Sequence, residues 1–197
     1  MRVAIVGGTG DFGLALAARL VEAGDEVVIG SRDARRAQEK ASEIGAAAGA
    51  ANEDVVREAE LVVLATNAGA TLATAQALRP FLAASLLSVA SEIPPTVAGS
   101  LAERTAEIVD VPVVAGLHSL AAGKLARGRP DEDAFVCGDD ADAKALALEL
   151  AAKVVAGRAL DAGPLASARA LEGMTAVIVN LNKRYKGHAG VRVTGLP

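Results

Sequence analysis

Hydrophobic and polar positions follow a strand-then-helix order along the first part of the chain. Short apolar runs of the kind that form strands buried on both faces occupy residues 3–6, 26–29, 61–65, 86–90 and 111–116. Apolar residues at helical spacing lie between these runs, over residues 12–23, 33–44, 70–79 and 98–108. The stretch 45–51, rich in Ala and Gly, is ambiguous: we interpret it as a loop, and a degraded short strand is the alternative. This alternation predicts an α/β fold built on a Rossmann-type doubly wound parallel sheet.

The order changes after residue 117. We expect residues 123–133, which are rich in Gly, Pro and charged side chains, to form a mobile connector. A strand, a helix, a second strand and a long helix are then predicted over residues 134–137, 141–156, 158–161 and 165–185. The chain is therefore predicted to hold a Rossmann domain over residues 1–117 and a small C-terminal α/β domain over residues 118–197.

Composition and charge narrow the class of protein. The net charge of −4 argues against a nucleic-acid-binding protein, which usually carries a basic surface. No apolar run approaches the roughly 20 residues that span a bilayer, so we expect no membrane partner. The single Cys137 excludes a disulfide framework, and two His residues leave little for a metal site, so we expect no metal. These features are typical of a cytoplasmic protein.

A glycine motif directly after the first strand predicts a phosphate-binding loop. The pattern G-x-G-x-x-G is formed by Gly8, Thr9, Gly10, Asp11, Phe12 and Gly13. Its glycines permit a tight turn, a close approach of a pyrophosphate and close packing of the helix on the strand. The helix N-terminus offers free N–H groups to the phosphates. We expect Asp11 to cap this helix with its carboxylate turned aside. An ordinary Gly-rich turn is the alternative.

The residues after the second strand indicate which dinucleotide binds. NAD sites place an Asp or Glu there for the ribose 2′-OH, whereas this chain has Ser31 and Arg32, with Arg36 one helical turn later. A hydroxyl and two guanidinium groups suit a 2′-phosphate. Asp33, the nearest acid, is interpreted as the cap of the next helix. We therefore predict NADP(H) as cofactor, with a solvated charged turn as the alternative.

These motifs and several C-terminal ones resemble a known family, the NADPH-dependent reductases of the deazaflavin coenzyme F420, also called F420H2:NADP oxidoreductases. The C-terminal segments that carry the resemblance are Val136–Asp140, Leu160–Leu165, Arg184–Lys186 and His188–Thr194. The resemblance implies an oxidoreductase that transfers a hydride between C4 of the nicotinamide and C5 of the deazaflavin, with both rings stacked between the two domains.

The resemblance also implies roles for individual residues. The NADP phosphates and ribose would be held by Thr9, Gly10, Asp11, Phe12, Ser31, Arg32 and Arg36. Thr66, Asn67, Ala90 and Ser91 would lie near the nicotinamide. His118, Ala122 and the turn at Ala189 and Gly190 would border the deazaflavin, which is the second substrate. The C-terminal domain would then bind the acceptor and form a homodimer, with the apolar helix 165–181 as its interface.

The sequence departs from the family pattern near the acceptor. The segments Thr66–Ala70 and Ser91–Pro95 lack the usual Pro and a longer insertion, respectively, and the segment after His118 is short. An NADPH-dependent reductase of another acceptor (a flavin, a quinone or a metal chelate) and a non-enzymatic NADP-binding redox sensor therefore stay as alternatives. Small-molecule redox coenzymes are the expected partners in each case. The sensor would need a protein partner as well.

Three further features have two readings each. His118 either contacts the deazaflavin, as the candidate catalytic residue, or is a structural residue at a strand end. The basic group Lys183, Arg184, Lys186 and Arg192 either steers an anionic coenzyme or forms a solvated helix end. Cys137 is expected to be a packing residue rather than a reactive thiol, and Asp139 and Asp140 are expected to be helix caps.

Overall fold

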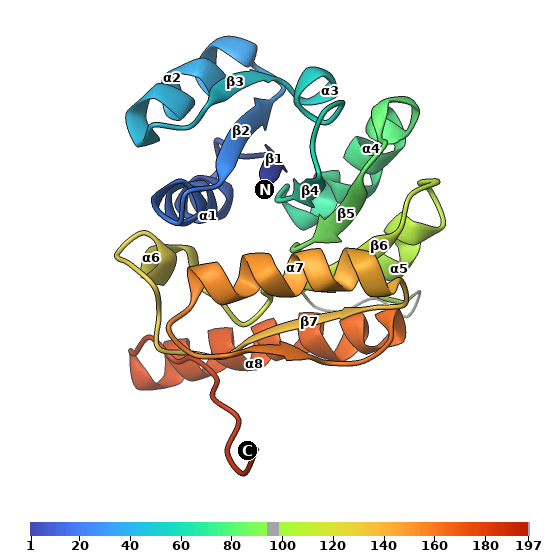
Figure 1. The fold of residues 1–197 in the computed structure, drawn as a ribbon. Coiled ribbons are helices and arrows are strands. Elements are labelled where there is room, and N and C mark those ends of the chain that lie inside the picture. Colours follow the sequence, from blue (N-terminus) through green and yellow to red (C-terminus); the bar gives the residue numbers. More distant parts are fainter. Residues whose placement is uncertain (94–98, 197) are drawn as a thin grey trace.

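The computed structural model of the protein describes residues 1–93 and 99–196. Its centre is one eight-stranded sheet with the strand order β3-β2-β1-β4-β5-β6-β7-β8 (Figure 1). The strands are β1 (Arg2–Val6), β2 (Glu26–Ser31), β3 (Ala48–Ala51), β4 (Leu61–Leu64), β5 (Ser85–Ser88), β6 (Val113–Gly116), β7 (Ala134–Gly138) and β8 (Ala159–Asp161). Strands β1 to β6 pair in parallel, and β7 pairs antiparallel with β6. The predicted fold class is confirmed.

Helices cover both faces of the sheet. They are α1 (Asp11–Glu22), α2 (Ala34–Ile44), α3 (Asn52–Val55), α4 (Ala68–Leu78), α5 (Leu101–Ala106), α6 (Ala122–Leu125), α7 (Ala141–Val154) and α8 (Ala168–Tyr185), with 3-10 turns η1 (Arg79–Phe81) and η2 (Leu165–Ser167). In β1, Val3 and Ile5 face the core under α1, α2, α6 and α7, whereas Ala4 and Val6 face the core under α3, α4, α5 and α8. Because successive side chains of a strand point to opposite faces, continuous apolar strands supply both cores.

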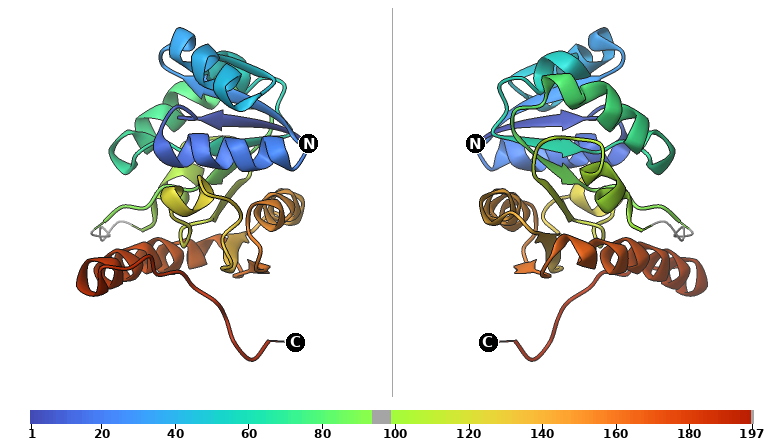
Figure 2. Two further views of the ribbon diagram at one scale, coloured as in Figure 1. Left: turned by 90° about the vertical axis from the view of Figure 1, so that its left-hand side faces the viewer. Right: turned by 90° about the vertical axis from the view of Figure 1, so that its right-hand side faces the viewer.

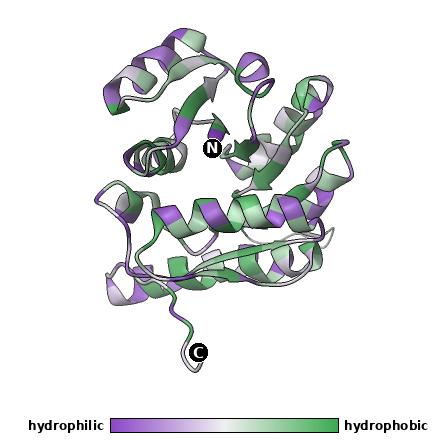
Figure 3. Ribbon diagram, in the orientation of Figure 1, coloured by the Kyte–Doolittle hydropathy of each residue, from purple (hydrophilic) through white to green (hydrophobic). Residues whose placement is uncertain are grey.

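The hydropathy pattern of α7 matches its position against the sheet. Figure 3 shows hydrophobic and hydrophilic residues alternating along α7, which lies across the sheet. Its buried side chains, among them Ala143, Ala147 and Leu150, recur at helical spacing. This is the pattern of a helix with one apolar face against the sheet.

The C-terminal part of the chain extends the same sheet. Strand β7 pairs with β6, and β8 pairs in parallel with β7. Helix α8 lies along this end of the molecule, and the C-terminal end of the chain projects from the body (Figure 2). Glu172 fastens α8 to the start of α5, where its carboxylate accepts from the Ala102 N–H at 3.3 Å. The boundary predicted after residue 117 thus falls inside a continuous sheet, and the division into two domains stays a prediction.

The structure decides between the two readings of the Ala- and Gly-rich stretch and corrects the expected connector. The stretch contains the short strand β3, paired along β2, so the loop reading is wrong and the short strand is confirmed. A Cβ at Gly49 would lie only 2.2 Å from the Ala37 carbonyl oxygen, so glycine allows α2 to approach this strand closely. The expected mobile connector 123–133 contains part of α6 and ends in the buried carboxylates of Glu132 and Asp133.

The helix expected over residues 98–108 is α5, which begins at Leu101 after a capping box formed by Ser100 and Glu103. Residues 94–98 lie outside the described residues, as does the part of the predicted Ser91–Pro95 departure that falls on Pro94 and Pro95. The remaining capping predictions behave as follows: Asp33 caps α2, Asp140 caps α7, and the Asp139 carboxylate accepts from the Leu165 N–H at the start of η2.

Candidate cofactor site

The glycine loop joins β1 to α1 and is fitted tightly to its surroundings. The Gly8 N–H donates to the Ile5 carbonyl and to the Gly30 carbonyl, both at 3.1 Å, which ties the loop to the end of β2. A Cβ at Gly13 would lie 2.7 Å from the Gly7 carbonyl oxygen, so this glycine is required by the chain itself. A Cβ at Gly10 would meet only that same oxygen, at 3.4 Å. The space beside Gly10 is therefore open to a ligand, as a pyrophosphate requires of this position.

Asp11 does not cap α1. Gly10 is the N-cap residue, no side chain in the described part of the chain caps the helix, and Asp11 is its first helical residue. The predicted capping role is wrong because the helix begins one residue earlier than expected. Among the described residues, the N–H groups of Asp11 and Phe12 have no hydrogen-bond acceptor. These groups, with the positive end of the helix dipole, are free to bind an anion.

The end of β2 carries the side chains predicted for a 2′-phosphate. The Ser31 hydroxyl accepts from the Asp33 N–H at 3.2 Å, and the Asp33 carboxylate accepts from the Arg36 N–H at 3.1 Å. The Arg36 guanidinium lies 3.5 Å from the Thr9 carbonyl oxygen, so it reaches across to the glycine loop. In the part of the chain that the structure describes, Arg32 and Arg36 form no ion pair. Both cations are thus available to a ligand.

These elements enclose a cleft of about 630 Å³ at the carboxyl ends of β1, β2 and β4. This is the edge at which open α/β sheets bind their ligands. Nine of the residues predicted from the sequence line the cleft: Thr9, Gly10, Asp11, Phe12, Ser31, Arg32, Arg36, Thr66 and Asn67. Gly8 and Gly13 pack against the backbone of the loop itself and do not line the cleft. The other predicted site residues do not line this cleft either: Ala90, Ser91, His118, Ala122 and Ala189.

Three polar residues of the cleft were not predicted as site residues, and Asp33 is one of them, expected only as a helix cap. Asn52 begins α3 and Thr74 belongs to α4, and both line the cleft. The Asn52 side chain is buried, and its Oδ1 atom has no hydrogen-bond partner among the described residues. Asn52 directly follows β3, so predicting its position would have required recognising the strand in the Ala- and Gly-rich stretch.

Thr66 and Asn67 begin the segment after β4. The Asn67 carboxamide oxygen accepts from the Ala70 N–H at 3.0 Å and so caps α4. The Thr66 hydroxyl lies 3.2 Å from the hydroxyl of Thr71. Asn67 thus has a structural role in the chain, which leaves its exposed amide group facing the cleft that it lines.

A second polar group lies between the loop after β5 and helix α8. The hydroxyls of Ser91 and Thr175 are 2.8 Å apart, and Thr175 donates to the His118 carbonyl oxygen at 2.8 Å. Leu117, just before this carbonyl, has a φ of 65°, a left-handed conformation that costs free energy for a side chain other than glycine. The structure therefore brings the predicted residues Ser91 and His118 together through Thr175, which was not predicted.

The His118 imidazole is buried, with 5% of the residue exposed. Neither ring nitrogen has a hydrogen bond of ordinary geometry to the described residues. Burial lowers the pKa of His118 from 6.5 to about 4, and the nearby Ala90 backbone opposes part of this shift. The ring is neutral at neutral pH, so it is suited to hydrogen bonding and poorly suited to act as a proton donor.

The other predicted acceptor residues lie further along the chain. Ala122 begins α6 and lines a mostly apolar groove of about 470 Å³ against α1, which Asp11 also borders. The Ala189 N–H donates to the Asn182 side chain at 2.5 Å, which holds the chain after α8 close to that helix. Arg192 is paired with Asp131 at 2.9 Å. Of the predicted basic group, Lys183, Arg184 and Lys186 are exposed.

The fold and the glycine loop define a Rossmann-type dinucleotide-binding protein. Residues 2–92 match the family described as NADP oxidoreductase, coenzyme F420-dependent. The F420-dependent NADP reductases of Methanothermobacter marburgensis and Methanocaldococcus jannaschii are 35% and 32% identical to this chain. These similarities cover 100% of this chain and 100% and 99% of the two relatives. The chain belongs to the family of F420-dependent NADP reductases, and the resemblance seen in its motifs is confirmed.

Solved structures agree with this placement. The crystal structure of a protein from Arthrobacter sp. FB24, assigned as an F420-dependent NADP reductase, is similar with a TM-score of 0.85 and 28% identity over 99% of this chain and 100% of that one. An imine reductase of Streptomyces aurantiacus is similar with a TM-score of 0.69 and 24% identity, over 92% of this chain and 61% of that one. The second likeness shows the fold alone.

Proposed function

We propose that this protein transfers a hydride between NADPH and the deazaflavin coenzyme F420. The observation that carries the proposal is the cleft beside the glycine loop, with Ser31, Arg32 and Arg36 at its 2′ end, in a chain whose full-length relatives are F420-dependent NADP reductases. When both coenzymes bind, the hydride passes from C4 of the nicotinamide to C5 of the deazaflavin, and a proton from solvent completes the reduction of the acceptor.

The role of the chain's own residues is to bind and orient. The N–H groups at the start of α1 and the open space at Gly10 suit a pyrophosphate. Arg32 and Arg36 suit the 2′-phosphate, which distinguishes NADP from NAD. Hydride transfer between two rings depends mainly on proximity and alignment, so no residue needs to exchange a proton in that step.

The second ring is proposed to bind beside His118, Ala122 and Ala189. Support comes from the hydrogen bonds that join Ser91, Thr175 and the His118 carbonyl, because they fix the loop after β5 against α8. The neutral His118 ring would then offer a hydrogen bond to the deazaflavin rather than a proton. The exposed cations Lys183, Arg184 and Lys186 favour steering of an anionic coenzyme toward this side.

A homodimer that forms through α8 is part of the proposal. Val177, Leu181 and Tyr185 are exposed by 58%, 41% and 71%, and they follow one another at four-residue spacing along the helix. Such a stripe is unusual on the surface of a monomer. Replacing Leu181 with Glu is expected to shift the sedimentation coefficient to that of a monomer, and an unchanged value would contradict this interface. We also propose a cytoplasmic location, which suits the free thiol of Cys137.

The function is tested by following the absorbance of the oxidised deazaflavin with NADPH and purified protein. We expect turnover with the deazaflavin, a strong preference for NADPH over NADH, and little turnover with riboflavin-type acceptors. Turnover with a flavin, quinone or metal chelate but not with the deazaflavin would overturn the assignment of the acceptor. NADPH binding without turnover on any acceptor would favour the redox sensor.

A further inference from the structure

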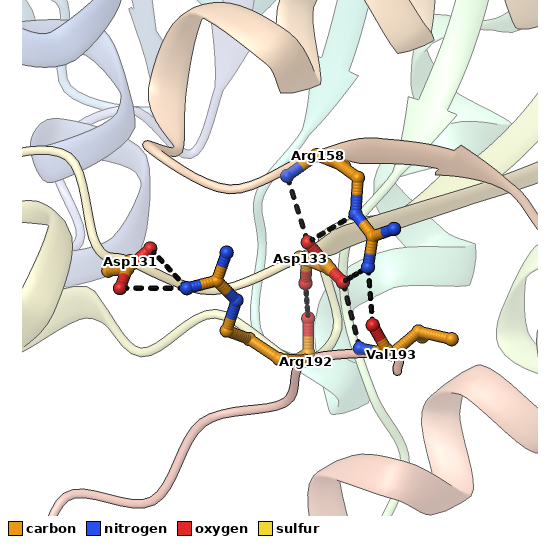
Figure 4. Close-up of polar contacts among 6 residues, drawn as sticks. Asp131, Asp133, Arg158, Arg192 and Val193 are labelled. Atoms are coloured by element: carbon orange, nitrogen blue, oxygen red, sulfur yellow. Dashed lines mark hydrogen bonds and ion pairs between the residues drawn. The ribbon is translucent and has the colours of Figure 1, made fainter. Parts of the chain in front are cut away.

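One buried carboxylate holds the chain that follows α8. Asp133 is fully buried, and its side chain accepts from the Arg158 N–H at 2.9 Å, from the Arg158 guanidinium at 2.8 and 3.3 Å, and from the Val193 N–H at 2.8 Å. Its own N–H donates to the Val191 carbonyl at 2.8 Å. Figure 4 shows Asp133 between Arg158 and Val193, with the separate pair of Asp131 and Arg192 to one side.

The same residue is joined to the segment that follows β6. The buried Ser119 hydroxyl donates to the Asp133 carbonyl oxygen at 3.2 Å, and Ser119 follows His118 directly. The Asp133 backbone and side chain therefore connect two segments, residues 118–119 and residues 189–193, that are about seventy positions apart in the chain. Neither connection depends on a regular strand pairing.

The turn before Val191 packs against the residue next to Asp133. A Cβ at Gly190 would overlap the Glu132 carboxylate, so a larger residue there would require the Glu132 side chain to move. Glu132 is buried and forms an ion pair with Lys124 of α6. The chain after α8 therefore lies against the loop before β7, which is joined by an ion pair to α6, the helix that begins at Ala122. Its position depends on the two buried carboxylates of Glu132 and Asp133.

Arg158 offsets the free-energy cost of burying the Asp133 carboxylate. A buried carboxylate without a partner is strongly unfavourable, and bidentate pairing with a guanidinium is the arrangement that offsets this cost. The Arg158 guanidinium holds the pKa of Asp133 well below its usual range. The guanidinium also donates to the Val193 carbonyl, so it binds the tail directly. Without Arg158 an unpaired carboxylate would be left against Val191 and Val193, which favours displacement of the tail and entry of water.

We infer that Asp133 and Arg158 form a clasp that positions the acceptor side of the site by fixing both residues 118–119 and residues 189–193. They are positioning residues, because they act through Ser119 and through the tail. The inference rests on the proposed function for its effect on the acceptor, whereas the order of the tail can be measured without any coenzyme. It leaves the NADP cleft untouched, since neither residue lines it.

The test compares Arg158→Gln with Arg79→Gln in the full-length protein. Arg79 forms a similar bidentate pair with Asp110, but both of these side chains are exposed and neither has a hydrogen bond or ion pair to the described residues of the tail. The two variants therefore lose the same charge and the same type of pair. Hydrogen exchange at residues 189–196 should be faster in Arg158→Gln only. Its kcat/KM for the deazaflavin should fall roughly tenfold or more, because displaced binding groups misalign the reactants.

The affinity for NADPH, measured by fluorescence titration, should stay the same in both variants. Arg158→Lys, which keeps a charge beside Asp133, should recover part of the loss. A merely structural role would lower kcat through a smaller folded fraction and leave the KM for the deazaflavin unchanged. That result, or equal tail exchange in Arg158→Gln and Arg79→Gln, would overturn the inference. If the wild-type protein does not reduce the deazaflavin, the proposed function fails, and tail exchange alone then decides whether the clasp exists.

Discussion

Acidification should destabilise this protein through His118. The perturbation is a change from pH 7 to pH 5, applied to the wild type and to the variant His118→Gln. In the folded protein burial lowers the pKa of His118 to about 4, against 6.5 for an exposed histidine. Between these two values the unfolded chain binds a proton that the folded chain excludes, so stability is lost as the pH falls.

The magnitude follows from these two pKa values. At pH 7 the ring is almost neutral in both states, and its contribution to the pH dependence is close to zero. At pH 5 it is protonated in nearly all unfolded molecules and in few folded ones. The linkage relation then gives a loss of about 2 kcal/mol in the free energy of unfolding between pH 7 and pH 5. The loss is complete only below pH 4, where the folded state is protonated as well.

The assay is urea unfolding followed by circular dichroism, because the chain has no Trp. The free energy of unfolding is measured at pH 5, 6 and 7 for both proteins. All other titrating groups are shared, so the difference between the two proteins reports on His118. We expect the wild type to lose about 2 kcal/mol more than His118→Gln over this range. Equal losses would show that His118 is not buried as a neutral ring.

The burial of His118 has a second consequence for activity. If the ring stays neutral above about pH 5, the pH profile of kcat near pH 6.5 should be the same in the wild type and in His118→Gln. An inflection near pH 6.5 in the wild type alone would refute a purely positional role and indicate proton transfer by this residue.

Other predictions concern the glycine loop, the 2′-phosphate end and the thiol. Gly13→Ala should lower the free energy of unfolding by about 1–3 kcal/mol, because the added Cβ meets the Gly7 carbonyl. Gly10→Ala should fold normally and bind NADPH weakly. Equal melting temperatures of the two variants would contradict this difference in stability. Arg32→Glu should raise the KM for NADPH by roughly tenfold or more and narrow the preference over NADH, and an unchanged preference would count against this role. Cys137 should resist thiol reagents at pH 8 until the protein unfolds, since burial raises its pKa to about 11; rapid labelling of the native protein would contradict its burial.

Local signals in the sequence were enough to predict most of the residues that line the cleft beside the glycine loop. The strand, the glycine motif and the helix that follows are neighbours in the chain, so their spacing alone places this loop. Ser31, Arg32 and Asp33 are equally local, and the predicted cap at Asp33 is confirmed. Asp11 shows the limit of such reasoning, because a shift of one residue in the helix start removes its capping role.

The features that sequence reasoning missed depend on contacts between distant residues. Strand β3, which the sequence indicated only as a degraded short strand, has poor intrinsic strand propensity; it pairs with β2, and Gly49 allows α2 to pack closely on it. Asn52 was missed with it. The segment 123–133 looked mobile because its polar residues suggested exposure. Asp133 is buried only because Arg158 and Val193, 25 and 60 residues further along, supply its partners.

Transfer of isotope between the two coenzymes tests the proposed reaction most directly. NADPH carrying deuterium at C4 is mixed with the oxidised deazaflavin and the protein in ordinary water, and the reduced deazaflavin is analysed by mass spectrometry. Direct hydride transfer within this site predicts deuterium at C5 of the reduced deazaflavin, from one of the two C4 positions of NADPH. Deuterium lost to solvent, or a deazaflavin that stays oxidised, would contradict it.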